Sequence, residues 1–145
     1  MEATTQQLPT VVLHQPKPGF KHNPEWETTE DIGSVVGEPT LGLDEFLKDG
    51  ESYVVGTTMV ERAKVLGNLA GQSHAERLLD NQQDIPVEWR QFVLVFAGTI
   101  RRCPSDNDLY VACLYGSDDG RGWVLGFGWL DGRFDGRYRL VRLGK

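Results

Sequence analysis

The sequence predicts an α+β domain, in which short N-terminal helices pack on a four-stranded antiparallel β-meander and a disordered tail precedes the domain. Three observations support this class. Residues 43–84 carry apolar side chains at helical spacing, residues 92–143 carry them at the period of two typical of strands, and the later connections are short. Helices that precede strands in this way are typical of α+β proteins. We expect the tail to cover residues 1–40 and a single domain to cover residues 41–145.

Residues 1–40 have the composition of a disordered segment. They hold five of the seven prolines and few large apolar side chains, so they bury too little surface to offset the entropy cost of ordering. Two exceptions stay open. The apolar run at residues 11–13 is suited to dock as an edge strand, and Phe20 and Trp26 are anchors for either a partner or the domain itself.

Short helices are expected in the first half of the domain. The apolar side chains of residues 43–47 have the i, i+3, i+4 spacing of a helix that ends near Gly50. The next two helices are expected to begin at T-x-x-E and S-x-x-E capping boxes, at residues 58–61 and 73–76. The last helix is expected to end near residue 83, before a proline.

Four strands are expected in the second half, at residues 92–101, 109–115, 123–130 and 137–143. The first is apolar on both faces and is therefore expected at the centre of the sheet. The fourth is the last in the chain and is expected at a sheet edge, beside the third. Gly126 and Gly128 share one face of the third strand, where we expect a helix to lie across them.

The charge distribution limits the classes of partner. Residues 1–85 hold 6 Lys and Arg against 14 Asp and Glu, whereas residues 86–145 hold 9 against 7, for a net charge of −6. An acidic chain is a poor general binder of nucleic acid, because phosphate neutralisation supplies most of that affinity. The longest apolar run, residues 92–97, is far shorter than a membrane helix, and the first residues lack the pattern of a secretory signal. We therefore expect a cytoplasmic protein with no membrane partner.

No metal site, cofactor or catalytic centre is expected. Cys103 and Cys113 are out of register across the turn between them, so we expect them to be unbridged thiols in a reducing compartment. Neither is placed at a helix N-terminus that would lower the pKa of a thiol. The aspartates of the later turns are explained by hydrogen bonds to the turn backbone. No C-x-x-C or H-x-x-x-H pattern is present, and the histidines are scattered, at His14, His22 and His74.

Three short patterns resemble those of small bacterial proteins that have no assigned function. They are Pro-x-Glu-Trp-Arg at residues 86–90, Phe-x-Gly-Thr at residues 96–99 and Trp-Leu-Asp at residues 129–131. The resemblance covers about residues 43–143 and implies a bacterial, cytoplasmic origin. It implies no activity, substrate or site residue.

An Arg-rich and aromatic pattern in the last two predicted strands is the strongest candidate for a binding surface. Aromatic rings with flanking arginines bind single-stranded nucleic acid or form the hot spot of a protein interface. The same rings are also expected of a hydrophobic core whose arginines are solvated, and the sequence leaves both interpretations open. The candidate binding residues are Arg121, Trp123, Trp129, Arg133, Arg137, Arg139 and Arg142.

These observations favour a small non-enzymatic binding or interaction module whose partner is another protein. The alternative is a nucleic-acid or nucleotide binder that uses the C-terminal Arg and aromatic surface. A small hydrolase is a more distant hypothesis, because no pairing of a base with a nucleophile is visible in the sequence.

Overall fold

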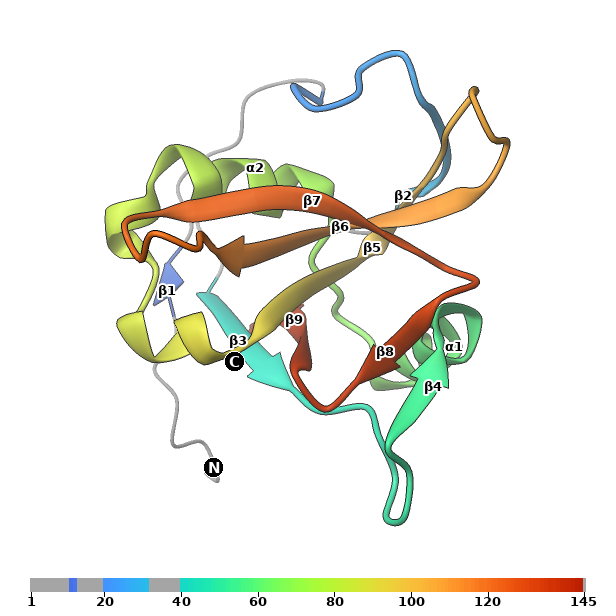
Figure 1. Ribbon diagram of the computed structural model, residues 1–145, viewed down its shortest axis with the longest axis horizontal. Coiled ribbons are helices and arrows are strands. Elements are labelled where there is room, and N and C mark those ends of the chain that lie inside the picture. Colours follow the sequence, from blue (N-terminus) through green and yellow to red (C-terminus); the bar gives the residue numbers. More distant parts are fainter. Residues whose placement is uncertain (1–10, 13–19, 32–39, 145) are drawn as a thin grey trace.

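The computed structural model describes residues 11–12, 20–31 and 40–144 of the chain, and its strands form one large and one small sheet (Figure 1). The main path of the large sheet runs through β1 (Val11–Val12), β3 (Thr40–Asp44), β9 (Tyr138–Leu143), β5 (Val93–Arg102), β6 (Leu109–Gly116) and β7 (Trp123–Trp129). β2 (Glu27–Asp31) pairs with β5, and the small sheet joins β4 (Tyr53–Val55) to β8 (Arg133–Asp135). The pairings described are antiparallel, except that β5 and β9 are parallel. The predicted α+β class is confirmed.

Two α-helices lie in the described part of the chain, on different sides of the large sheet. α1 (Gly56–Leu66) packs beside β4 and β8, whereas α2 (Gln72–Asp80) packs against β5, β6 and β7 (Figure 1). Two short 3-10 helices, η1 (Gln82–Asp84) and η2 (Val87–Gln91), connect α2 to β5.

The core has two parts, separated by the large sheet. Leu94 and Phe96 of β5 contribute to the part beneath α2, together with Trp89 of η2. Val95 and Ala97 contribute to the part on the side of α1. β5 is therefore buried on both faces and lies inside the sheet, as its composition predicts.

Both capping boxes are wrong as helix starts. α1 begins at Gly56 and α2 at Gln72, and neither N-cap residue caps its helix with its own side chain. The backbone after β7 replaces the cap of α1, since the carbonyl of Leu130 accepts the Thr57 N–H at 3.1 Å. A Cβ on Gly56 would lie 2.6 Å from that same carbonyl oxygen, so only glycine permits this close approach. Tertiary contacts, and not local signals, place the start of α1.

The predicted helix at residues 43–47 is also wrong. Leu43 lies in β3, opposite Val141 of β9, and Phe46 is buried in the loop that follows. Pairing with a strand almost a hundred residues away outweighs the weak helical spacing of this segment.

The four-stranded meander is replaced by a different topology. β5, β6 and β7 form the antiparallel meander expected of the first three strands, but β8 then leaves the sheet to pair with β4. β9 returns on the other side of β5 and runs parallel to it. The last strand is therefore interior, between β3 and β5, and its predicted edge position is wrong.

The face of β7 that carries Gly126 and Gly128 is covered by side chains and not by a helix. A Cβ on Gly128 would lie 2.9 Å from the Phe134 ring, and one on Gly126 would lie 3.2 Å from the Tyr115 ring. A Cβ on Gly128 would also lie 3.3 Å from the Cys113 thiol. Cys103 and Cys113 are buried and unbridged, and burial raises the pKa of Cys113 to about 12.

Part of the predicted tail belongs to the folded domain. Val11 and Val12 form β1 at the edge beside β3, as the apolar run predicts. Residues 20–31 pack on the domain and include β2. The prediction of disorder is wrong for these residues, and the rest of residues 1–40 lies outside the described ranges except for Thr40, which begins β3.

His74 of α2 is buried, and its ring is expected to make the stability depend on pH. Its Nδ1 accepts the Gly71 N–H at 2.9 Å, so Nδ1 carries no proton and the ring is neutral. Burial lowers the pKa of His74 from 6.5 to about 4. The unfolded chain therefore binds this proton more tightly than the folded chain. We expect the free energy of unfolding to fall by roughly 3 kcal/mol as the pH drops from 6.5 to about 4.

Urea unfolding of the wild type and of His74→Gln at neutral and acidic pH tests this expectation. Glutamine keeps an acceptor for the Gly71 N–H but does not titrate, so the variant should lose less stability on acidification. Equal losses in both proteins would assign the acid sensitivity to the carboxylates instead.

Candidate functional site

β7 is the last strand on the main path of the large sheet, and one of its edges carries no described strand. It pairs with β6 along its whole length, from Gly116 opposite Trp123 to Tyr110 opposite Trp129. In Figure 1 β7 runs along the top of the sheet, so that its free edge faces upward.

The hydrogen-bond ladder shows which residues of β7 face this free edge. The Leu130 N–H donates to the Leu109 carbonyl at 3.0 Å, and the Ser117 N–H donates to the Gly122 carbonyl at 2.9 Å. In an antiparallel pair the bonded positions alternate along the strand. The even-numbered residues of β7 therefore bond to β6. The main-chain groups of the odd-numbered residues point outward, and these are Trp123, Leu125, Phe127 and Trp129.

Two of the eight outward groups have partners. Gln82 Oε1 accepts the Trp123 N–H at 2.9 Å, and the Trp129 carbonyl accepts the Gly132 N–H at 2.9 Å. The six others have no hydrogen-bond partner among the described residues, and we call them the open groups. They are the Trp123 carbonyl, the N–H and carbonyl of Leu125, the N–H and carbonyl of Phe127, and the Trp129 N–H.

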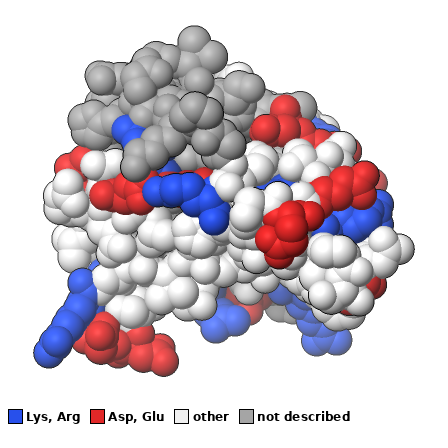
Figure 2. All heavy atoms as spheres, turned by 90° about the horizontal axis from the view of Figure 1, so that it is seen from above, with Lys and Arg blue, Asp and Glu red and all other residues white. Residues whose placement is uncertain are grey.

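β7 lacks the features that usually protect an edge strand. Natural edges carry lysines, prolines or bulges that prevent pairing with another strand. The sequence of β7 is WVLGFGW, which has neither a charge nor a proline, and its register with β6 is continuous. Figure 2 looks down on this side of the molecule and shows a broad surface without charged side chains.

An aromatic cluster extends from one end of β7. The Trp26 ring lies 4.9 Å from that of Phe127 and 5.2 Å from that of Tyr110, measured between centroids. Trp129 is opposite Tyr110 and therefore projects from the same face of the sheet. Trp129 keeps 47% of its surface exposed. The cluster thus offers apolar surface directly beside the open groups.

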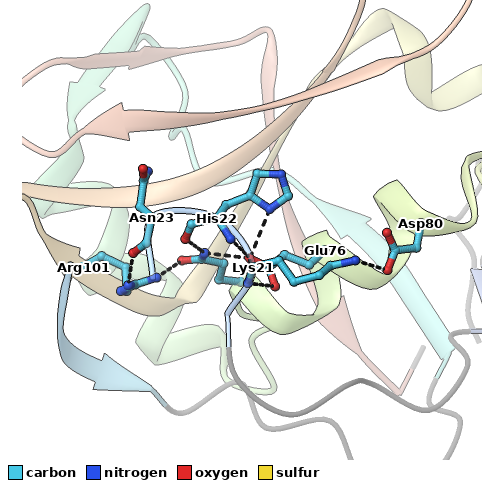
Figure 3. Close-up of polar contacts among 7 residues, drawn as sticks. Lys21, His22, Asn23, Glu76, Asp80 and Arg101 are labelled. Carbon is cyan, nitrogen blue, oxygen red and sulfur yellow. Dashed lines mark hydrogen bonds and ion pairs between the residues drawn. The ribbon is translucent and has the colours of Figure 1, made fainter. Parts of the chain in front are cut away.

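The strap, residues 20–26, brings Trp26 into this cluster, and a carboxylate holds the strap at its start. Glu76 of α2 accepts the backbone N–H of Lys21 at 2.9 Å and that of His22 at 2.8 Å (Figure 3). Lys21 also forms an ion pair with Asp80. Gln72 donates to Glu76 at 3.0 Å and to the His22 carbonyl at 3.0 Å, so the carboxylate is well supplied with donors.

Arg101 holds the other end of the strap. Its guanidinium donates to the Asn23 carbonyl at 2.6 Å and to Gln72 Oε1 at 2.7 Å (Figure 3). It also donates to the Trp26 carbonyl at 2.9 Å. The Phe20 ring covers the guanidinium at 4.6 Å. Arg101 is only 1% exposed, and burial lowers the pKa of its guanidinium.

A carboxylate borders the aromatic cluster. The Tyr110 hydroxyl donates to Asp106 at 2.5 Å, which raises the pKa of Tyr110 to about 12 and lowers that of Asp106. Tyr110 is therefore a neutral donor at physiological pH, and its ring is fixed beside Trp26.

The residues predicted as a binding surface do not lie on one surface. Trp123 is 8% exposed and belongs to the core beneath α2. Trp129 is exposed at the other end of β7, and Arg121 lies in the turn before this strand. Of the two interpretations left open, the core holds for Trp123, whereas Trp129 remains available at the surface.

The remaining arginines each have a separate partner. Arg133 lies over the Tyr53 ring at 4.4 Å, and Arg137 pairs with Asp135 at 3.1 Å. Arg139 stacks on the Phe92 ring at 4.3 Å. Arg142 pairs with Asp44 at 3.0 Å and donates to the carbonyls at the end of α1.

The candidate binding residues predicted from the sequence do not include Leu125 or Phe127, and Trp26 is predicted there only as an anchor for a partner or for the domain itself. The absence of charge in β7 was the available signal, but it carries meaning only once the strand is known to lie at an edge.

The chain matches no protein-family profile, and no curated protein or solved structure gives a significant match. The resemblance to small bacterial proteins therefore stays a prediction. In the described ranges, no helix has the length and apolar composition needed to cross a membrane, and no three His, Cys, Asp or Glu side chains are grouped as metal ligands would be.

Proposed function

We propose that this domain is a non-enzymatic binding module that takes an extended segment of a partner protein along the free edge of β7. The observation that carries the proposal is the row of six open groups on an uncharged strand. An added strand bonds to such groups through its own main chain, which supplies affinity with little dependence on its sequence. Selectivity then comes from alternate side chains, half of which would lie over the face that carries the aromatic cluster.

The nucleic-acid alternative lacks a comparable observation. Arg133, Arg137, Arg139 and Arg142 are spread over β8, β9 and the connection between them, and each already has a partner. At Arg137 and Arg142, phosphate would have to compete with the carboxylates of Asp135 and Asp44. We expect weak binding of a single-stranded oligonucleotide at physiological salt, and tight binding that falls steeply with salt would favour the alternative.

A Leu125→Pro variant tests strand addition at this edge. Proline removes the outward Leu125 N–H but leaves the bonds between β6 and β7 intact, because Leu125 does not donate to β6. Peptides selected from a random display library on the wild-type domain should bind the variant at least about tenfold more weakly, since strand addition is lost. Leu125→Val is the matched control, which keeps the N–H and should bind as the wild type does.

Amide exchange locates the bound peptide. The Leu125 and Phe127 amides should exchange slowly in the complex and rapidly in the free domain. If a monomeric domain yields no binder, or if the selected peptides bind Leu125→Pro as well as the wild type, β7 is not the binding edge.

A further inference from the structure

We infer that the strand added to β7 is β7 of a second copy of this chain, in an antiparallel pair related by a twofold axis at Gly126. The inference rests on the proposed function, because it uses the same free edge and names its occupant. In this register a residue that lies before Gly126 faces the residue equally many positions after Gly126 in the second copy. Leu125 therefore faces Phe127 of the second copy, and Trp123 faces Trp129.

The open groups match one another in this register. Leu125 and Phe127 of the second copy exchange two hydrogen bonds, as directly opposed residues of an antiparallel pair do. The Trp129 N–H of each copy donates to the Trp123 carbonyl of the other. The hydrogen bonds between the two copies are therefore symmetric about Gly126, which is also the middle residue of β7.

The occupied groups obey the same symmetry. The Trp123 N–H is bonded to Gln82, and the Trp129 carbonyl is bonded to Gly132. In the proposed register these two occupied groups face each other, so neither opposes an open group. A shift of two residues in either direction would place an occupied group against an open one and lose bonds. The pattern of occupied and open groups thus selects both the occupant and the register.

Charge and side-chain size agree with this pairing. Arg121 and Asp131 are both exposed and lie five residues before and five residues after Gly126. In the pair, Arg121 of each copy would therefore lie near Asp131 of the other. At the axis Gly126 faces Gly126, and Val124 faces Gly128, so the two chains can approach without a clash on that face. A twofold pair of identical patches is the commonest form of homodimer.

The mass in solution is the first test. Light scattering of the full chain should give roughly twice the 16.3 kDa of the monomer at high protein concentration. Leu125→Pro should be monomeric under the same conditions, and Leu125→Val should remain dimeric. Circular dichroism shows whether Leu125→Pro keeps the fold, which separates loss of pairing from unfolding.

A cysteine at the axis tests the register. In the pair the two Gly126 Cα atoms would lie about 4.5 Å apart, within the range of a disulfide. Gly126→Cys should therefore cross-link into a dimer on mild oxidation. Val124→Cys is the matched control, since Val124 faces Gly128 and is offset by four residues from its own copy. Efficient cross-linking of Val124→Cys instead would overturn the register.

Charge reversal tests the ends of the pair. Arg121→Asp and Asp131→Arg, made singly, should each raise the dissociation constant by about tenfold, because each places like charges together twice. The double variant Arg121→Asp, Asp131→Arg restores opposite charges and should recover the wild-type constant. A double variant as weak as the single ones would contradict the proposed contact.

The failure of this inference is distinguishable from the failure of the proposed function. A wild-type chain that stays monomeric at all concentrations, yet binds display-selected peptides that Leu125→Pro does not bind, overturns the second copy as occupant and retains the edge as a site. A monomer that binds no such peptide overturns both. A dimer that Leu125→Pro leaves intact shows that the copies meet on another surface.

Discussion

Replacement of Trp123 by alanine is expected to lower the free energy of unfolding by about 3–5 kcal/mol. The side chain is 8% exposed and packs in the core beneath α2. The Arg90 guanidinium lies 5.7 Å from the centre of its ring, and its backbone N–H is tied to Gln82. Alanine would leave a cavity between β7 and η2 and remove the surface on which Arg90 rests.

Trp129→Ala is the matched control for this measurement. It changes the same residue type, on the same strand and the same face, but Trp129 is 47% exposed. We expect it to cost no more than about 1.5 kcal/mol, because much of the ring remains in water in the folded state. Equilibrium unfolding in urea compares the two. Equal losses would show that both tryptophans are core residues, and the surface beside the open groups would then be smaller than proposed.

The positions of the later strands are predictable from the sequence, but their order is not. The period of two and the β-branched and aromatic composition locate β5, β6, β7 and β9 to within about a residue. Their order depends on β8, a strand of three residues that carries no pattern of its own. Because β8 pairs with β4, the chain crosses under the sheet before β9 begins. A short segment therefore decides which strands become edges.

The candidate site follows from this crossover. If the fourth strand had joined the third, as the meander predicts, the free edge of β7 would be covered and Arg137 and Arg139 would lie at the sheet edge. β8 leaves the sheet, and the uncharged strand becomes the edge in place of the Arg-rich one. The arginines of β9 lie inside the sheet and contact other parts of the domain. Arg142 donates to a carbonyl at the end of α1, and Arg139 contacts Phe92 and the loop after β3.

The strap was hidden from sequence analysis for a different reason. It lies in the polar, proline-rich segment of residues 1–40, and residues 20–26 contribute only two large apolar side chains, Phe20 and Trp26. They are held mainly by polar groups of the domain, Glu76 and Arg101, through bonds to the backbone of the strap. Because these bonds are made to backbone groups, which every residue type has, the side chains of the strap do not predict them. Phe20 and Trp26 were the visible signals, and both contact the domain itself.

Replacement of Arg101 by methionine is expected to cost about 3–5 kcal/mol, because it removes one partner from a buried polar network. Methionine fills a similar volume but donates nothing to Gln72 Oε1 or to the carbonyls of Asn23 and Trp26. It also leaves the nearby Glu76 carboxylate without the opposing charge. The strap should detach locally before the domain unfolds, so the Lys21 and His22 amides, which donate to Glu76, should exchange much faster.

Arg102→Met is the matched control for this last prediction. Arg102 is the next residue of β5, but its side chain is 35% exposed and its ion pair with Glu27 is 3.4 Å long, so its loss should cost less than about 1 kcal/mol. Arg101→Lys, which keeps the charge without the planar fork, should fall between the two. Tryptophan fluorescence should report a more exposed Trp26 in Arg101→Met and no change in Arg102→Met. If Arg101→Met leaves the Lys21 and His22 amides protected, Glu76 alone holds the strap, and the role assigned to Arg101 in placing Trp26 beside β7 is wrong.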